Sequence, residues 1–177
     1  TEEGMRDTVR LVMLPLWNSW YFLSLYANAE SVEGKFDASS ENVLDRYIVS
    51  KLRSLVEATT KSFDSYDLFA ACAEIRTFLD VLTNWYIRRS RDRFWKGDAA
   101  AINTLHTVLH VVTRIAAPVL PLVSEQIFRG LTGERSVHLQ TWPTTNDLAD
   151  DKNLVASMDR VRDVCSTTLS LRKVHSR

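Results

Sequence analysis

Cations and aromatic side chains alternate over one short stretch of the sequence, from Asn84 to Lys96. The stretch reads NWYIRRSRDRFWK and contains five cations, one anion and four aromatic residues. Cationic side chains bind phosphate oxygens, and aromatic rings stack on nucleobases that have left their own stack, each stack contributing about 1–3 kcal/mol. These residue types favour contact with RNA, and a merely solvated charged helix face is the alternative.

Side chains on a helix project about 100° apart, so the whole stretch cannot serve one purpose. We expect Arg88, Arg91, Trp95 and Lys96 to lie on the outside and to meet phosphates and one unstacked base.

Two further arginines of the stretch continue a predicted buried line. Arg89 and Arg93 follow Leu82 and Tyr86 at helical spacing. We therefore predict that both make ion pairs inside the protein, with Glu125 as the acidic partner.

A second, smaller basic set comprises Arg46, Lys51 and Arg53. It suits phosphate contacts that weaken with salt, although a solvated face is again the alternative. The chain holds 22 basic and 22 acidic residues, so no global positive field draws it onto nucleic acid. Any contact with RNA must be local.

The sequence indicates no catalytic or metal-binding residues. His106 and His110 have the i, i+4 spacing of a shared metal, but the glutamate of a metalloprotease helix is missing between them. No glycine-rich phosphate loop follows a strand, and no Ser or Cys pairs with His and a carboxylate around an elbow. Cys72 and Cys165 lie far apart in apolar patterns, which predicts reduced, buried thiols.

Apolar residues return every three or four positions in six stretches, which predicts an all-α bundle of about six helices in one domain, residues 1–177. Pro15 should kink or interrupt the first helix. Residues 136–142 alternate like a short extended segment. The predicted helices cover about 5–29, 42–61, 68–95, 98–118, 122–131 and 154–172.

The longest apolar stretch, 9–29, is interrupted by polar residues, and no leader pattern opens the chain. We therefore expect a cytoplasmic protein without a membrane contact. The first helix also carries more aromatic residues than one core stripe needs, which favours packing against another domain, with base stacking as the second possibility. These residues are Trp17, Trp20, Tyr21, Phe22 and Tyr26.

Several motifs resemble one enzyme family. The run NWYIRRSRDRFW, preceded by Tyr66-Asp67 and alanines, is similar to the third-helix signature of isoleucyl-tRNA synthetases, closest to their eukaryote-like branch, which also occurs in some bacteria. The segments APVLPLVSE (117–125), SVHL (136–139) and Trp142-Pro143 resemble elements shared by isoleucyl, valyl and leucyl enzymes. LPLWNS (14–19) and LDRYI (44–48) resemble the openings of the first two anticodon-domain helices.

The resemblance covers nearly the whole chain and implies the anticodon-binding domain of a class I aminoacyl-tRNA synthetase, truncated at both ends. Its partners would be isoleucine tRNA and the other domains of a monomeric parent enzyme. That parent would use ATP and Mg²⁺, but neither the HIGH-like nor the KMSKS-like ATP signature nor an editing sequence is present here. The segment itself should be non-catalytic and hold no cofactor.

Three alternatives stay open. A valyl enzyme is the nearest sister, but acidic residues tend to follow its Trp-Tyr-Ile, whereas Arg88 and Arg89 follow here. The chain could instead be a structural module that braces neighbouring domains. An unrelated helical enzyme would need a pocket with perturbed ionisable groups, which no motif indicates.

Overall fold

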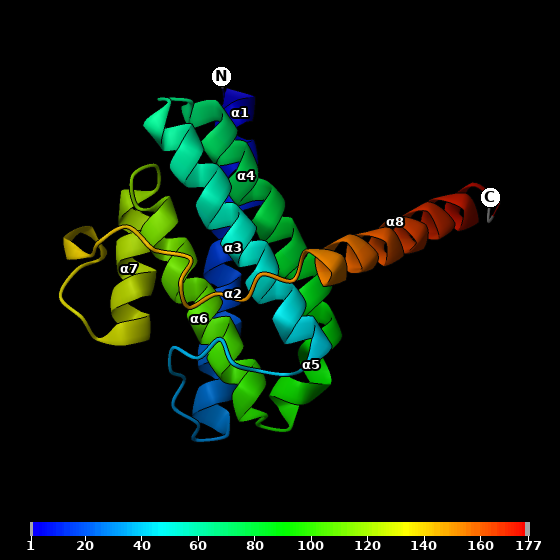
Figure 1. The fold of residues 1–177 in the computed structure, drawn as a ribbon, viewed down its shortest axis with the longest axis horizontal. Coiled ribbons are helices and arrows are strands. Elements are labelled where there is room, and N and C mark those ends of the chain that lie inside the picture. Colours follow the sequence, from blue (N-terminus) through cyan, green and yellow to red (C-terminus); the bar gives the residue numbers. More distant parts are fainter. Residues whose placement is uncertain (1, 176–177) are drawn as a thin grey trace.

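The computed structural model describes the backbone of residues 2–175 and the side chains of residues 2–172. This part of the chain is all-helical, without strands, and forms six helices, two of which contain a π-helical turn (Figure 1). The all-α prediction is confirmed. The elements are α1 (Glu2–Thr8), η1 (Val9–Met13), α2 (Leu14–Ala29), α3 (Val43–Asp64), α4 (Leu68–Asp80), η2 (Val81–Ile87), α5 (Arg88–Trp95), α6 (Ala99–Ala116), α7 (Pro121–Thr132), η3 (Val137–Leu139) and α8 (Lys152–His175).

The first helix passes Pro15 without breaking. Proline has no N–H, and its ring clashes with the carbonyl four residues earlier. Immediately before it the helix widens into η1, where the amide of Leu14 donates to the carbonyl of Val9, five residues back. The disturbance predicted at Pro15 is therefore a π-helical turn, and α1, η1 and α2 form one continuous rod.

Helix α6 forms the centre of the bundle. Asp98 caps its N-terminus by accepting hydrogen bonds from the amides of Ala100 and Ala101, at 2.9 and 3.3 Å. The helix is apolar or small on nearly every side, and it packs against α2, α3, α5 and α7. A helix of that composition is stable only when it is surrounded.

Other helix ends follow local rules as predicted. Asn42 accepts from the amide of Leu44 and caps α3. Pro121 begins α7, where a missing N–H costs nothing, and Gly133 ends it with a φ of 71°, which glycine adopts without strain.

The segment at residues 136–142 is not simply extended. Ser136 and Gln140 have extended dihedral angles, but residues 137–139 between them make the 3₁₀ turn η3. The carboxylate of Glu125 accepts hydrogen bonds from the Ser136 hydroxyl at 3.0 Å and the Val137 amide at 2.8 Å. Glu125 thus fixes this turn, and the prediction that it pairs with an arginine is wrong.

The loop 30–42 is tied to α6. The amide of Lys35 donates to Asn103 Oδ1 at 3.1 Å, and the amide of Asp37 donates to Thr107 Oγ1 at 2.7 Å. A side chain at Gly34 would press on His106, since a Cβ there would lie 3.1 Å from its Cδ2 atom. The loop therefore packs on α6 and covers that side of the core.

Beneath that loop the rings of His106 and His110 stack, with centroids 6.4 Å apart. Phe36 and Phe128 each lie 5.4 Å from His110, centroid to centroid. The pair thus packs as two aromatic rings. Among residues 2–172, no three His, Cys, Asp or Glu side chains come close enough to hold a metal ion.

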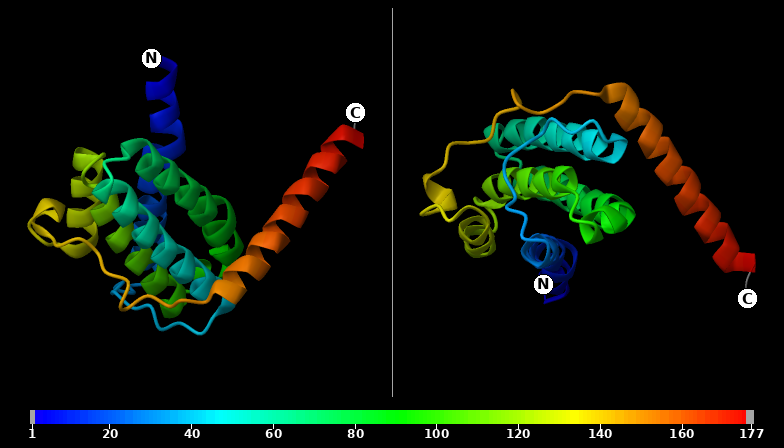
Figure 2. Two further views of the ribbon diagram at one scale, coloured as in Figure 1. Left: turned by 45° about the horizontal axis from the view of Figure 1, so that its top comes forward. Right: turned by 90° about the horizontal axis from the view of Figure 1, so that it is seen from below.

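Helix α8 departs from the predicted bundle. Its base packs against α3, and the rest runs away from the other helices (Figures 1 and 2). Leu154 and Met158 are half-buried at the base, whereas Val161, Val164 and Thr168, expected to face the core, are exposed. Periodicity predicted the helix but not that its apolar side lacks a partner here.

Both cysteines are free thiols, but neither is buried as predicted: Cys72 faces outward on α4 and is exposed, and Cys165 on α8 is half-buried. Within the described residues, none of the helices combines the length and the apolar character needed to span a bilayer.

A buried carboxylate, Asp45, joins four separate elements. Its side chain is fully buried and meets the guanidinium of Arg93 in two hydrogen bonds of 2.7 and 2.8 Å. It also accepts from the Tyr86 hydroxyl at 2.8 Å and the Ser40 hydroxyl at 2.6 Å. Arg93 Nε reaches Asp98 at 2.7 Å, so the network extends from α3 to the cap of α6.

Burial and the neighbouring Asp45 raise the pKa of Tyr86 well above its ordinary value. Burial opposes the ionisation of Asp98, but hydrogen bonds from Arg93 and the α6 amides outweigh it and lower the pKa of this carboxyl. The network is thus held with Tyr86 neutral and the carboxylate of Asp98 ionised at neutral pH.

The first prediction concerns this network. Asp45→Ala should lower the free energy of unfolding by about 3–5 kcal/mol, because Arg93 loses its buried partner. Urea denaturation followed by circular dichroism measures the loss. Asp92→Ala, on the exposed side of α5, should change stability by less than about 0.5 kcal/mol. A loss at Asp45 no larger than at Asp92 would contradict the network's role.

The second prediction concerns pH. Burial lowers the pKa of His110 to about 4, with Arg114 and His106 adding to the effect. Between pH 6.5 and 4 the unfolded chain binds a proton at His110 that the folded chain does not, so stability falls as the pH falls through this window. Because His110 is only half-buried, the loss should be roughly 1 kcal/mol between pH 7 and 4.5.

His110→Gln should remove this part of the acid sensitivity, measured as the difference between urea midpoints at pH 7 and 4.5. Asp98 and Asp159 have pKa values below their ordinary 3.8, so they stay ionised in the folded chain over this range. Equal losses in the variant and the parent chain would show that His110 is not responsible.

Candidate nucleic-acid interface

The outer face of α5 gathers exposed cations around an exposed indole. Arg88, Arg91 and Lys96 are exposed and form no ion pair within the described residues, and 73% of Trp95 is accessible. The ring of Tyr26, from α2, lies 6.4 Å from that of Trp95 and meets it edge on. We call Arg88, Arg91, Trp95 and Lys96 the α5 strip.

The strip faces outward because Ser90 and Phe94, on the opposite side of α5, are fully buried. Phe94 packs edge to face against Phe22 of α2, with centroids 5.0 Å apart. All four residues predicted to face outward on this helix therefore do so.

The π-helical turn η2 changes which residues face the core. In a regular α-helix, Arg89 and Arg93 would follow Leu82 and Tyr86 inward. The wider turn contains more residues than an α-helical turn, which rotates the residues after it about the helix axis. The buried line therefore runs from Leu82 and Tyr86 to Ser90 and Phe94. The reading of Arg89 as a buried ion-pair residue is wrong for this reason.

Arg89 instead lies exposed against an aromatic ring. Its guanidinium carbon is 4.6 Å from the centroid of Trp85, within the range of a cation–π contact. Arg93 does make the predicted internal ion pairs, but with Asp45 and Asp98 rather than Glu125. Arg89 thereby adds a cation to the surface beside the α5 strip, one that the sequence had assigned to the interior.

The basic set on α3 is occupied by the chain itself. Arg46 pairs with Asp151, and Lys51 lies 3.2 Å from Asp159. Arg53 donates to the carbonyls of Thr145 and Leu148, both at 2.9 Å, and pairs with Glu57. These three cations hold the connector and α8 to the bundle, and we withdraw them from the candidate surface.

Tyr47, buried on α3, anchors the base of α8. Its hydroxyl donates to Asp159 at 2.6 Å and accepts from Arg162 at 3.3 Å. Burial and the bond to Asp159 raise the pKa of Tyr47, while burial of Asp159 is outweighed by bonds from Tyr47 and Lys51, which lower its pKa. One cluster therefore sets the direction in which α8 leaves.

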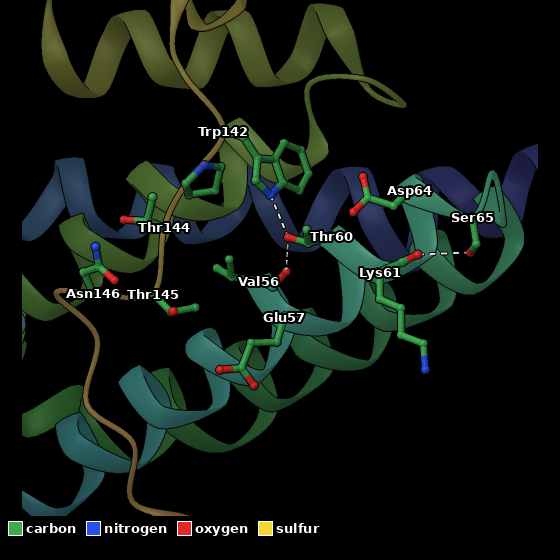
Figure 3. A pocket seen from close by; sticks show the side chains of 11 residues that line it. Val56, Glu57, Thr60, Lys61, Asp64, Ser65, Trp142, Thr144, Thr145 and Asn146 are labelled. Atoms are coloured by element: carbon green, nitrogen blue, oxygen red, sulfur yellow. Dashed lines mark hydrogen bonds between the residues drawn. The ribbon is translucent and has the colours of Figure 1, made fainter.

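A shallow groove of about 710 Å³ lies elsewhere, between α3 and the connector at 142–146 (Figure 3). The indole N–H of Trp142 points at Thr60 and donates to its hydroxyl at 2.8 Å. The hydroxyls of Thr60 and Ser65 in turn donate to the carbonyls of Val56 and Lys61. Backbone carbonyls engage both hydroxyls, so neither Thr60 nor Ser65 is an activated nucleophile, and Trp142 ties the connector to α3.

The geometry of the α5 strip suits a polyanion with unpaired bases. Cations without internal partners are free to bind phosphates, and an accessible indole can stack on a base. Sequence reasoning missed Arg76, an exposed cation on α4. Its spacing could have identified it, because Arg76 lies four residues before Asp80 and eight before Asn84 on the same helix.

The chain is similar to known proteins along nearly its whole length. Residues 45–176 match the family model described as the anticodon-binding domain of tRNA ligase. The isoleucine–tRNA ligase of Leifsonia xyli subsp. xyli is 58% identical over 98% of this chain, and those of Nocardia farcinica and Mycobacterium tuberculosis are each 57% identical over 98% of it. The chain spans only 16% of the length of each of these relatives.

These similar proteins are actinobacterial, and the matches do not support the eukaryote-like branch expected from the third-helix motif. Their function as isoleucine ligases agrees with the isoleucyl rather than the valyl resemblance. With the model covering three quarters of its length and an all-helical fold, the chain belongs to the family of anticodon-binding domains of tRNA ligases.

Proposed function

We propose that this chain is the anticodon-binding part of a monomeric, cytoplasmic isoleucine–tRNA ligase and that its α5 strip holds the anticodon stem-loop of an isoleucine tRNA. The parent enzyme would join isoleucine to that tRNA with ATP and Mg²⁺. Both would bind outside this segment, since neither ATP signature of the class lies within it.

One observation carries the proposal. In a chain with no net charge, three cations without internal partners surround an indole that is 73% exposed. Of the other two cations on α5, Arg93 pairs with Asp45 and Asp98, and Arg89 lies exposed against the Trp85 ring. A local positive surface with an aromatic platform is the pattern for phosphate contacts next to an unstacked base.

The third prediction tests the cations. Arg88→Glu/Arg91→Glu should lower affinity for an isoleucine tRNA transcript by roughly tenfold or more at about 0.1 M salt, and flatten the slope of log affinity against log salt by about 1.5. Filter binding over a salt series measures both, with an anticodon-swapped transcript alongside. Equal binding of the two transcripts by the parent chain would argue against anticodon recognition.

Arg129→Glu/Arg135→Glu is the matched control, because it makes the same change in net charge at two exposed arginines around the end of α7, far from α5 (Figure 1). If it weakened binding as much as the α5 double variant, the effect would come from net charge, and the α5 strip would lose its assigned role.

The fourth prediction tests the aromatic platform. Trp95→Ala should weaken tRNA binding by about 1–3 kcal/mol and leave the salt slope unchanged, because it removes a stack and no charge. The urea midpoint should hardly move, since the side chain is mostly exposed. Phe69→Ala removes an aromatic side chain that is 87% exposed on α4 and should leave binding intact. Equal effects of the two variants would contradict stacking at Trp95.

A second role is favoured by the outer face of α2. Leu14, Trp17, Tyr21 and Leu25 form an exposed apolar stripe at helical spacing along it. The chain covers one sixth of its relatives' length, so other domains of the parent enzyme are available to cover such a stripe. Bracing those domains is compatible with binding tRNA through α5, because the two surfaces lie on different helices.

A further inference from the structure

A second groove, of about 710 Å³, has a basic lining and lies between the first helix, the α4–η2 helix and the base of α8. Figure 2 shows α8 and the N-terminal helix leaving the bundle separately. Residues near the base of each helix contribute to the groove lining. Four cations and one carboxylate contribute to the lining, together with two asparagines: Arg10, Lys51, Arg76, Arg162, Asp80, Asn18 and Asn84.

The cations of the groove differ in how firmly they are held. Arg76 is exposed and forms no ion pair within the described residues. Arg10 lies 2.9 Å from Asp7, but 71% and 46% of their side chains are exposed, so the pair is weak and can be exchanged for a phosphate. Lys51 and Arg162 are already engaged, because both pair with Asp159 and Arg162 also lies 3.8 Å from Asp80, so Arg76 and Arg10 are the cations of the groove that a ligand can reach. Cations still outnumber carboxylates when Asp7 and Asp159 are included.

The groove continues into the α5 strip along one face of a single helix. Six exposed residues on that helix are spaced by four, four, four, three and four positions: Arg76, Asp80, Asn84, Arg88, Arg91 and Trp95. Such spacing keeps side chains on one side, and the wider turn of η2 accommodates the repeated steps of four. At 1.5 Å per residue this line is about 28 Å long.

The two ends of the line differ in chemistry. The α5 end offers an exposed indole. No aromatic side chain lines the groove, and its apolar lining residues include Leu11, Leu14 and Val81. Cations and amides without an aromatic platform suit phosphates and sugars rather than unstacked bases. A line of this length passes several successive phosphates of a duplex strand.

We propose that the groove binds the sugar–phosphate backbone of an RNA stem whose loop contacts the α5 strip. This inference rests on the proposed function and extends it. The RNA loop would supply the base that Trp95 stacks on. Arg76, Arg10 and Asn18 would bind the backbone of the stem. The helix from α4 to α5 would thus contact the stem at one end and the loop at the other.

The fifth prediction separates the two ends of the line with two probes: an RNA hairpin of the anticodon stem and loop, and a single-stranded oligonucleotide of the loop alone. In the chain of residues 1–177, Arg76→Glu should weaken hairpin binding about 3- to 10-fold and flatten its salt slope by about 1. It should leave binding of the loop oligonucleotide unchanged. Trp95→Ala should weaken both.

Lys61→Glu is the control, because it reverses an exposed cation on α3 that lies outside this line and forms no ion pair within the described residues. Hydroxyl-radical footprinting of the hairpin gives a second readout: protection of the stem backbone should disappear with Arg76→Glu and persist with Lys61→Glu. Urea midpoints of both variants should match the parent chain, since both side chains are exposed.

An effect of Arg76→Glu no larger than that of Lys61→Glu, or an equal loss for hairpin and loop, would overturn the groove's role. The proposed function would survive that result if Arg88→Glu/Arg91→Glu still weakened both probes. Failure of the parent chain to bind either probe at low salt would instead overturn both proposals.

Discussion

The ion pair between Asp45 and Arg93 is the interaction on which the rest of this structure depends. A fully buried carboxylate is costly unless every oxygen finds a donor, and Asp45 finds Arg93, Tyr86 and Ser40. Because these donors come from separate elements, the cost can be offset only when the elements come together. The pair therefore makes the relative placement of α3, η2 and α5 a condition of folding.

That placement has a consequence for the surface. Arg93 is drawn inward at the edge of α5, and Phe94 fills the core beside Phe22. Within the described residues, Arg88, Arg91 and Lys96 stay on the outside and form no ion pair, although Asp92 is also exposed on α5. The neutral protein thus has a local positive surface because cations outnumber carboxylates on this face of α5.

Cations of similar type play opposite parts in this chain. Lys51 and Arg53 fasten the connector and α8 to α3, while Arg88 and Arg91 have no such partner. The difference arises from neighbours far away in the sequence, since Asp159 and the carbonyls at 145 and 148 lie about a hundred residues beyond α3. Composition around each cation gives no hint of it.

The sequence by itself determined the helices, most of their ends and the outward position of Arg88, Arg91, Trp95 and Lys96. These features follow from local rules: apolar residues every three or four positions, a capping Asn42, Pro121 at a helix start and Gly133 at a helix end. The motifs also determined the family, because they follow one another in the family's order along almost the whole chain.

Only the tertiary structure decided which charges pair, where α8 goes and how the α4–α5 helix is phased. The turn η2 shifts the helix by a fraction of a turn, which moved Arg89 outward and placed Ser90 and Phe94 inside. Glu125, an expected partner of arginine, holds a 3₁₀ turn instead. The reason is physical: hydrophobic periodicity acts within one helix, whereas a charge is satisfied by whichever donor or acceptor the folded chain brings within about 3 Å.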